Sequence, residues 1–514
     1  MKKLVESFLD PFLVKYLPTI AEKRQASRLR MQCNAMAASW SGASTTSPGL
    51  SNFFPGVSDI DSSMLYELGE MRNRSHDHVR NVPIAGGLIN RICDHSIGEK
   101  GLMLHPKIDT NSLGLPPESG IEWQEKVSAR WRLFAESKES DHLRRININK
   151  KGYLTLQSQL EGGDCFTLFL DYDRPGSPFT FKTQTIEAEL VSNPNNESNS
   201  RFLYDGIAKD SNLIPEKIWI SDVHPGNSQY LYPTEWTARN FYSANGNPLV
   251  LQHYNQIRPN QSRGVPILGT VTGKLLNLNK YSDATLVKAI IESYLTVIIK
   301  GDKQDTQPNF KSPDAINKSH KVSDKYELGS GNFIRLEKEA ELEVVGSKNP
   351  SPLFSPYFEA MVAEIGAACG VPRSLIMMMF DKSYSASRGE VILAWMTFLK
   401  YRTMIATGYY QPIYERFLDL EIANGNIPAP GYFENPMIKK AYRGSAYHQW
   451  SGPVREAINE MNAANANKLY NELGVKSKKQ ITEEISSADW ETVNTQIQHE
   501  ESLRIGAGIP EEEI

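Results

Sequence analysis

Cysteine is scarce in this sequence. Its 514 residues include four cysteines, and none of them belongs to a C-x-x-C pair or has a histidine nearby at the spacing of zinc ligands. This excludes a disulfide-stapled scaffold and a zinc-ribbon site, and it favours a reduced compartment. We therefore expect neither a metal nor a cofactor; the cysteines are Cys33, Cys93, Cys165 and Cys369.

Long hydrophobic runs are also missing. The longest apolar stretches, 289–299 and 391–399, fall short of the roughly 20 residues that a transmembrane helix needs. The N-terminal segment 1–17 is partly apolar, but charged residues interrupt it and no small-residue cleavage site follows. We expect an amphipathic helix there, with no membrane span and no export signal.

Neither sign of charge is in clear excess. The chain has 56 lysines and arginines against 60 aspartates and glutamates, which gives a formal net charge of -4. A dedicated nucleic-acid binder usually has a strongly basic balance. Any contact with DNA would therefore have to come from a local arrangement of residues.

Local catalytic motifs are missing as well. The sequence contains neither an H-E-x-x-H nor a G-x-S-x-G motif. His76 and His78 lie two residues apart, so on a helix they point to nearly opposite sides and cannot share a metal. The paired carboxylates Asp171 and Asp173 sit beside a turn, where such groups are usually just solvated. These patterns give little support to an enzyme.

One segment, 269–275 (GTVTGKL), is similar to a phosphate-binding loop at the start of a helix. It has three residues between its glycines where a P-loop has four, and Leu275 stands where a Ser or Thr would hold Mg²⁺. We therefore interpret it as a helix start with permissive glycines. A nucleotide-dependent DNA-processing enzyme that uses 269–274 as a degenerate P-loop stays open as an alternative.

The order of polar and apolar residues predicts an α+β protein. A Ser-, Gly- and Pro-rich stretch within 1–60 is typical of a flexible arm. Between 101 and 254, short apolar runs alternate with turn signals, as in 165–172 followed by Asp-Arg-Pro-Gly, which is typical of strands and hairpins. Helical periodicity predicts helices at 61–81, 85–97, 273–300, 354–369, about 387–423 and several segments beyond 453, with a small β-containing module at 301–352.

A run of four large apolar residues, Met377 to Phe380, falls in the predicted loop 373–387. One interpretation is that this part of the loop is tucked into the core. The other is a compliant apolar tip that touches a partner, because methionine side chains are flexible and polarizable.

Several separated motifs together resemble the lambda-type portal family of tailed bacteriophages. Each is short, but they follow one another in the family's order over about residues 60 to 510. The motifs are 68–75 (LGEMRNRS) with 80–85 (RNVPIA), 98–102 (GEKGL), 162–166 (GGDCF), 258–266 (RPNQSRGVP), 370–372 (GVP), 384–388 (YSASR) and 450–453 (WSGP).

The resemblance implies a portal-type fold and no enzymatic activity. It implies a ring, expected to be dodecameric, at one capsid vertex, forming a channel for double-stranded DNA during packaging and ejection. The implied partners are the terminase large subunit, a head–tail connector protein, the major capsid protein and a scaffold. The expected location is the virion, after a stage in the host cytoplasm. A ring or scaffold protein that never contacts DNA is the remaining alternative.

The resemblance also divides the chain. It implies an N-terminal arm (1–60), a wing in two parts (61–272 and 389–450), stem helices (273–300 and 353–370), a clip (301–352), a tunnel loop (371–388) and a helical crown (451–514).

Two groups of site residues follow from this division. The tunnel loop would form a deformable apolar collar with light phosphate contact, and the clip would face the motor and later the connector. The tunnel-loop residues are Arg373, Met377, Met378, Met379, Phe380, Lys382 and Arg388, and the clip residues are Lys303, Lys311, Lys318, Lys321 and Lys325.

Overall fold

The computed structural model describes residues 55–227, 235–294, 298–300, 341–343, 354–380, 383–454, 460–486 and 490–506, with the short pieces 19–20, 22–24, 26–27 and 52–53. The chain divides into two compact units, residues 1–63 and 64–514. The arrangement below is that of the second unit. Among the residues that the structure describes, no helix is both long and apolar enough to cross a bilayer.

Two helices lead into this unit, α3 (Ile60–Asn81) and α4 (Pro83–Ser96). The break between them falls at Val82, as the sequence predicts, because the residue before a proline is forced out of the helical region and Pro83 is well suited to start a helix. One face of α4 is fully buried, with Leu88, Ile89 and Ile92 inaccessible to solvent.

Two antiparallel sheets form the β part. The first has the order β3 (Phe181–Glu187), β2 (Asp164–Asp171), β8 (Val250–Tyr254). The second has the order β4 (Leu203–Tyr204), β5 (Ile207–Lys209), β6 (Pro215–Ser221), β7 (Trp236–Asn240). The hairpin of β2 and β3 confirms the strand pattern and turn signal of the sequence.

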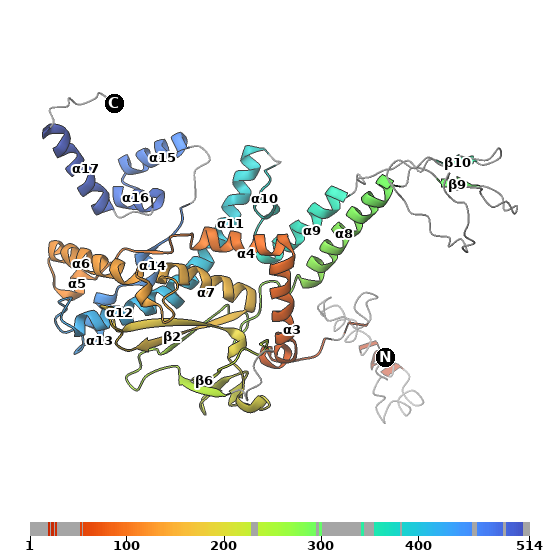
Figure 1. Ribbon diagram of the computed structural model, residues 1–514, viewed down its shortest axis with the longest axis horizontal. Coiled ribbons are helices and arrows are strands. Elements are labelled where there is room, and N and C mark those ends of the chain that lie inside the picture. Colours follow the sequence, from red (N-terminus) through yellow and green to blue (C-terminus); the bar gives the residue numbers. More distant parts are fainter. Residues whose placement is uncertain are drawn as a thin grey trace, which may run out of the picture. The chain divides into compact units, whose positions relative to one another are not determined.

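Strand β2 is buried on both faces. Phe166 and Leu168 point into a small core shared with the second sheet, whereas Phe169 belongs to the main core under the helices. This follows from the alternation of side chains along a strand. The layers are therefore helices, first sheet and second sheet, as Figure 1 shows for α7 (Ile148–Gly162), β2 and β6.

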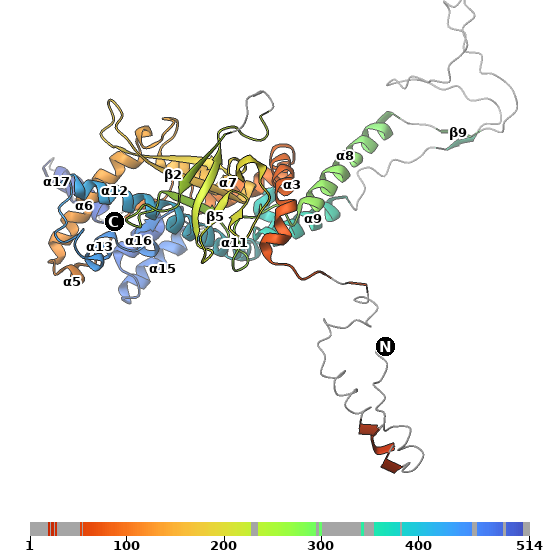
Figure 2. The same cartoon turned by 90° about the horizontal axis from the view of Figure 1, so that it is seen from below.

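Two long helices pack side by side, α8 (Thr272–Tyr294) and α9 (Phe354–Cys369), as both Figure 1 and Figure 2 show. Tyr281 of α8 stacks on Phe354 and meets Tyr357 edge-on, with ring centroids 5.5 and 4.9 Å apart. Leu275 and Leu278 at the start of α8 are buried in the main core, whereas Leu286 and Ile290 further along the helix are exposed.

The predicted helix 273–300 is too long by its last turn. Helix α8 ends at Tyr294, and residues 298–300 form strand β9 (Ile298–Lys300), which pairs with β10 (Glu341–Glu343). The sequence changes there to the β-branched run 296–299 (TVII), which favours a strand over a helix. Strand β10 lies within the predicted β-containing module 301–352, and the rest of that module lies outside the described residues.

One nearly continuous helix runs from residue 384 to residue 423. It consists of α11 (Tyr384–Ile405), a π-helical turn η5 (Ala406–Tyr410) and α12 (Gln411–Ala423). Pro412 explains the wider turn, because it has no N–H for the carbonyl of residue 408 and its ring would clash there. The N–H of Gln411 donates instead to the carbonyl of Ala406.

The remaining elements include helices, short strands and short turns. They include α6 (Pro117–Ala135), whose Trp131 and Phe134 pack on aromatic residues of α12, and the short strands β1 (Met103–Leu104) and β11 (Trp450–Ser451), which pair with each other. The other elements are α5 (Thr110–Leu113), α13 (Pro436–Arg443), α14 (Ala446–Gln449), α15 (Glu460–Glu472), α16 (Lys478–Ser486), α17 (Trp490–Gly506), and the short turns η2 (Lys138–Ser140), η3 (Ala188–Leu190) and η4 (Pro194–Asn196).

Candidate functional site

The candidate site is the turn between α9 and α11. Helix α9 ends at Cys369, and Gly370 follows with φ +75°, a backbone region that favours glycine. A Cβ at Gly370 would lie 2.6 Å from the Oγ1 of Thr397, so this position also needs a close approach to α11. The N–H of Val371 donates to the carbonyl of Gly366 at 2.9 Å, which closes the helix end.

A short helix, α10 (Arg373–Met377), occupies the first part of the predicted loop 373–387. Ser374 and Ile376 are buried, and the Ser374 hydroxyl donates to Oε2 of Glu390 at 2.5 Å. Met377 is packed against the main core. Of the two interpretations of the methionine run, core packing therefore holds for Met377.

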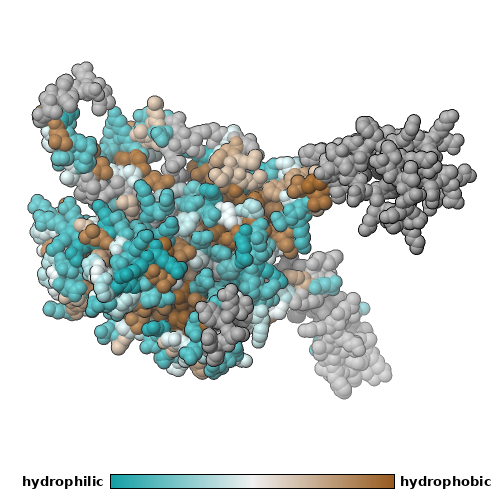
Figure 3. Space-filling model, viewed as in Figure 1, coloured by the Kyte–Doolittle hydropathy of each residue, from teal (hydrophilic) through white to brown (hydrophobic). Residues whose placement is uncertain are grey.

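The next three residues, Met378, Met379 and Phe380, form the tip. Their exposed fractions are 66%, 58% and 58%, and Figure 3 shows apolar side chains at the surface over α10 and the start of α11. Exposed large apolar side chains in a row are unusual on a protein surface and point to an interaction site. The side chains of 378–380 are therefore exposed, as an apolar tip requires.

Met378 holds an unusual backbone conformation. Its φ of 55° and ψ of 34° lie in the left-handed region, which costs a residue with a Cβ about 1 kcal/mol. Glycine or asparagine would fit this position more easily. The N–H of Met379 donates to the carbonyl of Ser374 at 3.0 Å, which fixes the turn.

Helix α4 is the platform beneath the tip. The Nη2 of Arg91 lies 3.4 Å from the Sδ of Met378, and its Nη1 lies 3.4 Å from Oδ2 of Asp94. The Tyr153 hydroxyl, from α7, donates to the other carboxylate oxygen of Asp94 at 2.9 Å. Residues far apart in the sequence thus meet at the tip.

Arg402 of α11 fixes this platform at its other end. Its guanidinium donates to the carbonyl oxygens of His95 (3.1 Å), Ser96 (2.9 Å) and Pro453 (2.5 Å). These include carbonyls that the end of α4 would otherwise leave without a partner. Burial lowers the pKa of Arg402 to about 10, so the side chain stays charged at neutral pH.

The structure assigns the other predicted tunnel-loop residues as follows. Arg373 is ion-paired with Glu359 of α9, so its charge is already partly compensated. Arg388 is exposed on the first turns of α11, which begins at Tyr384 and not near residue 387. Lys382 and the five predicted clip lysines, Lys303, Lys311, Lys318, Lys321 and Lys325, lie outside the described residues.

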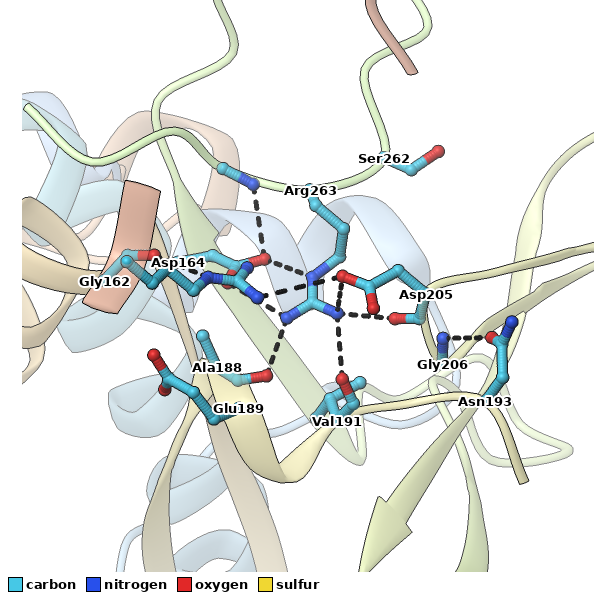
Figure 4. A network of polar contacts seen from close by, with 12 residues as sticks. Gly162, Asp164, Ala188, Glu189, Val191, Asn193, Asp205, Gly206, Ser262 and Arg263 are labelled. Atoms are coloured by element: carbon cyan, nitrogen blue, oxygen red, sulfur yellow. Dashed lines mark hydrogen bonds and ion pairs between the residues drawn. The ribbon is translucent and has the colours of Figure 1, made fainter. Parts of the chain in front are cut away.

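A second cluster, which sequence reasoning missed, is a buried network of charges around Asp164 (Figure 4). Arg263 donates to both carboxylate oxygens of Asp164, at 2.6 and 3.2 Å, and Arg72 of α3 donates to Oδ1 at 2.9 Å. Arg263 also binds Asp205 at 2.8 Å and the carbonyl of Ala188 at 2.8 Å.

The protonation state of Asp164 is set by its ion pairs with Arg263 and Arg72. Burial alone would raise the pKa of Asp164, but Arg263 and Arg72 outweigh it and hold that pKa below its ordinary value. The carboxylate is therefore ionised and tied to two cations. The network joins α3 to strand β2 of the first sheet and to Asp205, which lies between strands β4 and β5 of the second sheet.

A signal for this network was present in the sequence. Asp164 follows Gly162 and Gly163 at the start of an apolar run, and Arg263 precedes Gly264. A Cβ on Gly264 would lie 2.0 Å from the carbonyl oxygen of Gly163, so the two backbones touch beside the ion pair. Charged residues next to glycines at the edge of a buried strand are the pattern that would have identified it.

The P-loop alternative gains no support from segment 269–274. The N–H groups of Gly269, Val271 and Leu275 already donate to nearby carbonyls, at 2.9 to 3.0 Å. A phosphate-binding loop needs such groups free and convergent. Lys274, the expected phosphate ligand, is ion-paired with Glu364 of α9.

Glu187, Glu189 and His224 come close enough to one another to suggest a metal site. However, Nδ1 of His224 accepts the N–H of Gly226 at 3.0 Å, so the proton of the neutral ring lies on Nε2. That Nε2 faces Glu187 at 3.5 Å and, protonated, cannot bind a metal. We therefore describe the group as a histidine that faces Glu187 beside a second carboxylate, Glu189.

Glu189 belongs at the same time to a second histidine. His76 of α3 meets Glu161 through Nδ1 at 2.7 Å and Glu189 through Nε2 at 3.0 Å. Hydrogen bonds from Glu161 and Glu189 raise the pKa of His76 to about 10. The ring is an imidazolium that links α3, α7 and η3.

Fold and site together define an α+β protein with long paired helices and an exposed apolar turn. The family model of the phage portal protein, lambda family, matches residues 46–402. The chain therefore belongs to the lambda family of phage portal proteins, a structural family without enzymatic activity. This confirms the family that the sequence motifs suggested.

Comparisons with other proteins add the following. No curated protein sequence matches the chain. One similar solved structure is a chain of the virion of a native gene transfer agent particle, with 10% sequence identity and a TM-score of 0.44; the match covers 81% of this chain and 92% of that chain. Another is a chain of the neck of an empty gene transfer agent particle, with 12% identity and a TM-score of 0.44; that match covers 81% of this chain and 93% of that chain. A third comes from the neck of a native gene transfer agent particle computed with C12 symmetry, with 13% identity and a TM-score of 0.38; the match covers 70% of this chain and 88% of that chain.

Proposed function

We propose that the chain is the subunit of a dodecameric ring at one capsid vertex, and that double-stranded DNA passes through the centre of the ring during packaging and ejection. The observation that carries the proposal is the family match over residues 46–402. The matched range includes both long helices, the buried network and the exposed tip. The protein would act in the virion, after assembly in the host cytoplasm.

The parts of the chain would divide this work. The wing is 61–272 with 389–450, the stem is 273–300 with 353–370, the tunnel loop is 371–388, and the crown is 451–514. The clip, 301–352 with its lysines, would bind the terminase large subunit and later a head–tail connector protein. The major capsid protein and a scaffold would be further partners of the ring.

In this proposal the tip residues Met378, Met379 and Phe380 line the narrowest part of the channel. A channel must let a polyanion slide, and dense pairing of cations with phosphates would hold the DNA and make its motion strongly dependent on salt. An apolar, flexible surface with few charges suits a sliding contact. The near-neutral balance of the chain agrees with this.

Negative-stain images of the purified chain test the proposal. A ring with a central hole is the expected result, and class averages would give its symmetry. A monomer would contradict the proposal, and a solid or filamentous assembly would favour a scaffold that never contacts DNA. ATP hydrolysis that is lost in Lys274→Ala would instead favour the nucleotide-dependent enzyme.

A further inference from the structure

We propose that Arg91 of α4 is the positioning residue of the tip and supplies positive charge beside it. The inference rests on the proposed function, because it assigns a role within the tunnel loop. It differs from the sequence-based expectation, which placed the phosphate contact within the tunnel loop itself. It is based on an element, α4, that is far from the tip in the sequence.

The first support is the contact itself. Arg91 presents two nitrogens of one guanidinium to different partners, the Sδ of Met378 and Oδ2 of Asp94, each at 3.4 Å. The planar fork of arginine can bridge two acceptors in this way, which the ammonium of a lysine cannot do with the same geometry. Asp94 is in turn held by Tyr153, so the guanidinium rests on a fixed base.

The second support is the conformation of Met378. A left-handed residue with a side chain needs surroundings that hold it. The side chain of Met378 is 66% exposed, so packing does little to hold it, and its one polar atom faces Arg91. A donor at the sulfur therefore helps to keep the turn, and with it the direction of Met379 and Phe380.

The third support is charge. The Arg91 side chain is 30% exposed, so its cation reaches solvent next to the tip. Arg91 is ion-paired with Asp94 and Arg373 with Glu359, but Arg373 is only 17% exposed, so less of its charge reaches solvent. A half-screened guanidinium beside apolar residues gives a phosphate backbone a weak attraction without a tight grip.

Hydrogen exchange on the assembled full-length protein tests the positioning role. The variants are Arg91→Ala, Arg91→Lys, Met378→Leu and the double variant Arg91→Ala with Met378→Leu, with exposed Arg132→Ala of α6 as the matched control. We expect Arg91→Ala to speed exchange of the Met379 amide about fivefold, the factor that corresponds to losing one modest hydrogen bond. Arg132→Ala should leave that amide unchanged.

The double variant separates positioning from a general effect on α4. If Arg91 acts through the sulfur, Arg91→Ala and Met378→Leu should speed exchange by the same factor, and the double variant by no more than either. Multiplying factors would overturn the inference, as would an Arg91→Ala protein that exchanges like the control. Thermal unfolding of each variant identifies any that fold poorly, and Arg91→Lys then carries the comparison, because it keeps the charge and should still lose the bridge.

DNA retention in assembled particles tests the charge role. Arg91→Ala should release packaged DNA more readily than Arg132→Ala, and Arg91→Lys should retain it. Equal retention in Arg91→Ala and the control would overturn the charge role. Faster exchange of the Met379 amide in Arg91→Ala with normal DNA retention would support the positioning role but count against the proposed placement of the tip in the DNA channel. A failure of this inference can therefore be distinguished from a failure of the proposed function.

Discussion

At the scale of single residues, the most consequential side chain is Asp164. Its carboxylate is fully buried and is bound by two arginines, of which Arg263 is also fully buried. A buried ion pair contributes little net stability when whole, but removal of one partner leaves an uncompensated charge in the interior. The residue is therefore structural, and its importance would not show in any activity motif.

Asp164→Asn is predicted to lower the free energy of unfolding by about 3 to 5 kcal/mol, because Arg263 and Arg72 lose their counter-charge. Denaturant titration followed by circular dichroism measures this. Asp171→Asn, at the exposed end of the same strand, is the control; it breaks only the pair with Arg416 and should cost below about 1 kcal/mol. Equal losses in both variants would refute the argument.

The tip gives a second prediction at this scale. Replacing Met378 and Met379 together by serine should impair packaging or retention of DNA while ring assembly stays intact, because the exposed side chains contribute little to the fold. Particle DNA content and negative-stain images measure the two effects. Met377→Ser is the contrasting variant, since Met377 packs on the core and should lower stability instead. Normal packaging and retention of DNA in the double serine variant would contradict this prediction.

At the scale of elements, the charged side chains tie together segments that the hydrophobic pattern alone does not join. His76 connects α3 to α7 and η3, Arg402 connects α11 to the end of α4, and Arg91 connects α4 to the turn after α10. Each of these contacts holds one element against another at a defined point.

The His76 link predicts a pH dependence. Its pKa is about 10 in the folded protein against about 6.5 in the unfolded chain, so the folded state binds the proton more tightly. The stabilisation is complete below pH 6.5 and is lost as the pH rises toward 10. His76→Gln should remove this part of the pH dependence, measured by thermal unfolding from pH 6 to 10.

Exposed His499→Gln of α17 is the matched control and should keep the wild-type profile. Glu189 gives the opposite limb. Burial would raise its pKa, but the hydrogen bond from His76 and the charge of Arg72 lower it, so its stabilisation is lost as the pH falls through the acidic range. A wild-type profile in His76→Gln between pH 6.5 and 10 would contradict this account.

The sequence predicted those features that depend on neighbouring residues, and it missed contacts between distant segments. Proline at 83 and the hairpin turn after 172 act locally, so the break between α3 and α4 and the β2–β3 hairpin could be predicted. Helical spacing alone extended α8 into a β-branched run that forms a strand. The contact of Arg91 with Met378 spans 287 residues of sequence, and no local pattern reports such a contact.

At the scale of the whole molecule, the family followed from motifs scattered along the chain, and the family match over residues 46–402 bears it out. The α+β class followed from the pattern of polar and apolar residues, and the helices and two antiparallel sheets of the structure confirm it. The site could be predicted only as a segment. Within it, Met377 turned out to be core and Arg373 to be paired, because those outcomes depend on how α9, α10 and α4 meet.

The π-helical turn at Ala406–Tyr410 has a consequence for the phase of the long helix. One residue of an α-helix turns the chain by about 100°. Tyr409, Tyr410 and Tyr414 are fully buried and fix the rotation of α12 and η5 in the core. Removing one residue from η5 would rotate the whole of α11 about its own axis and bring the exposed side chains of Leu393 and Met396 around toward α4. A single codon in this turn therefore sets which side of α11 faces outward.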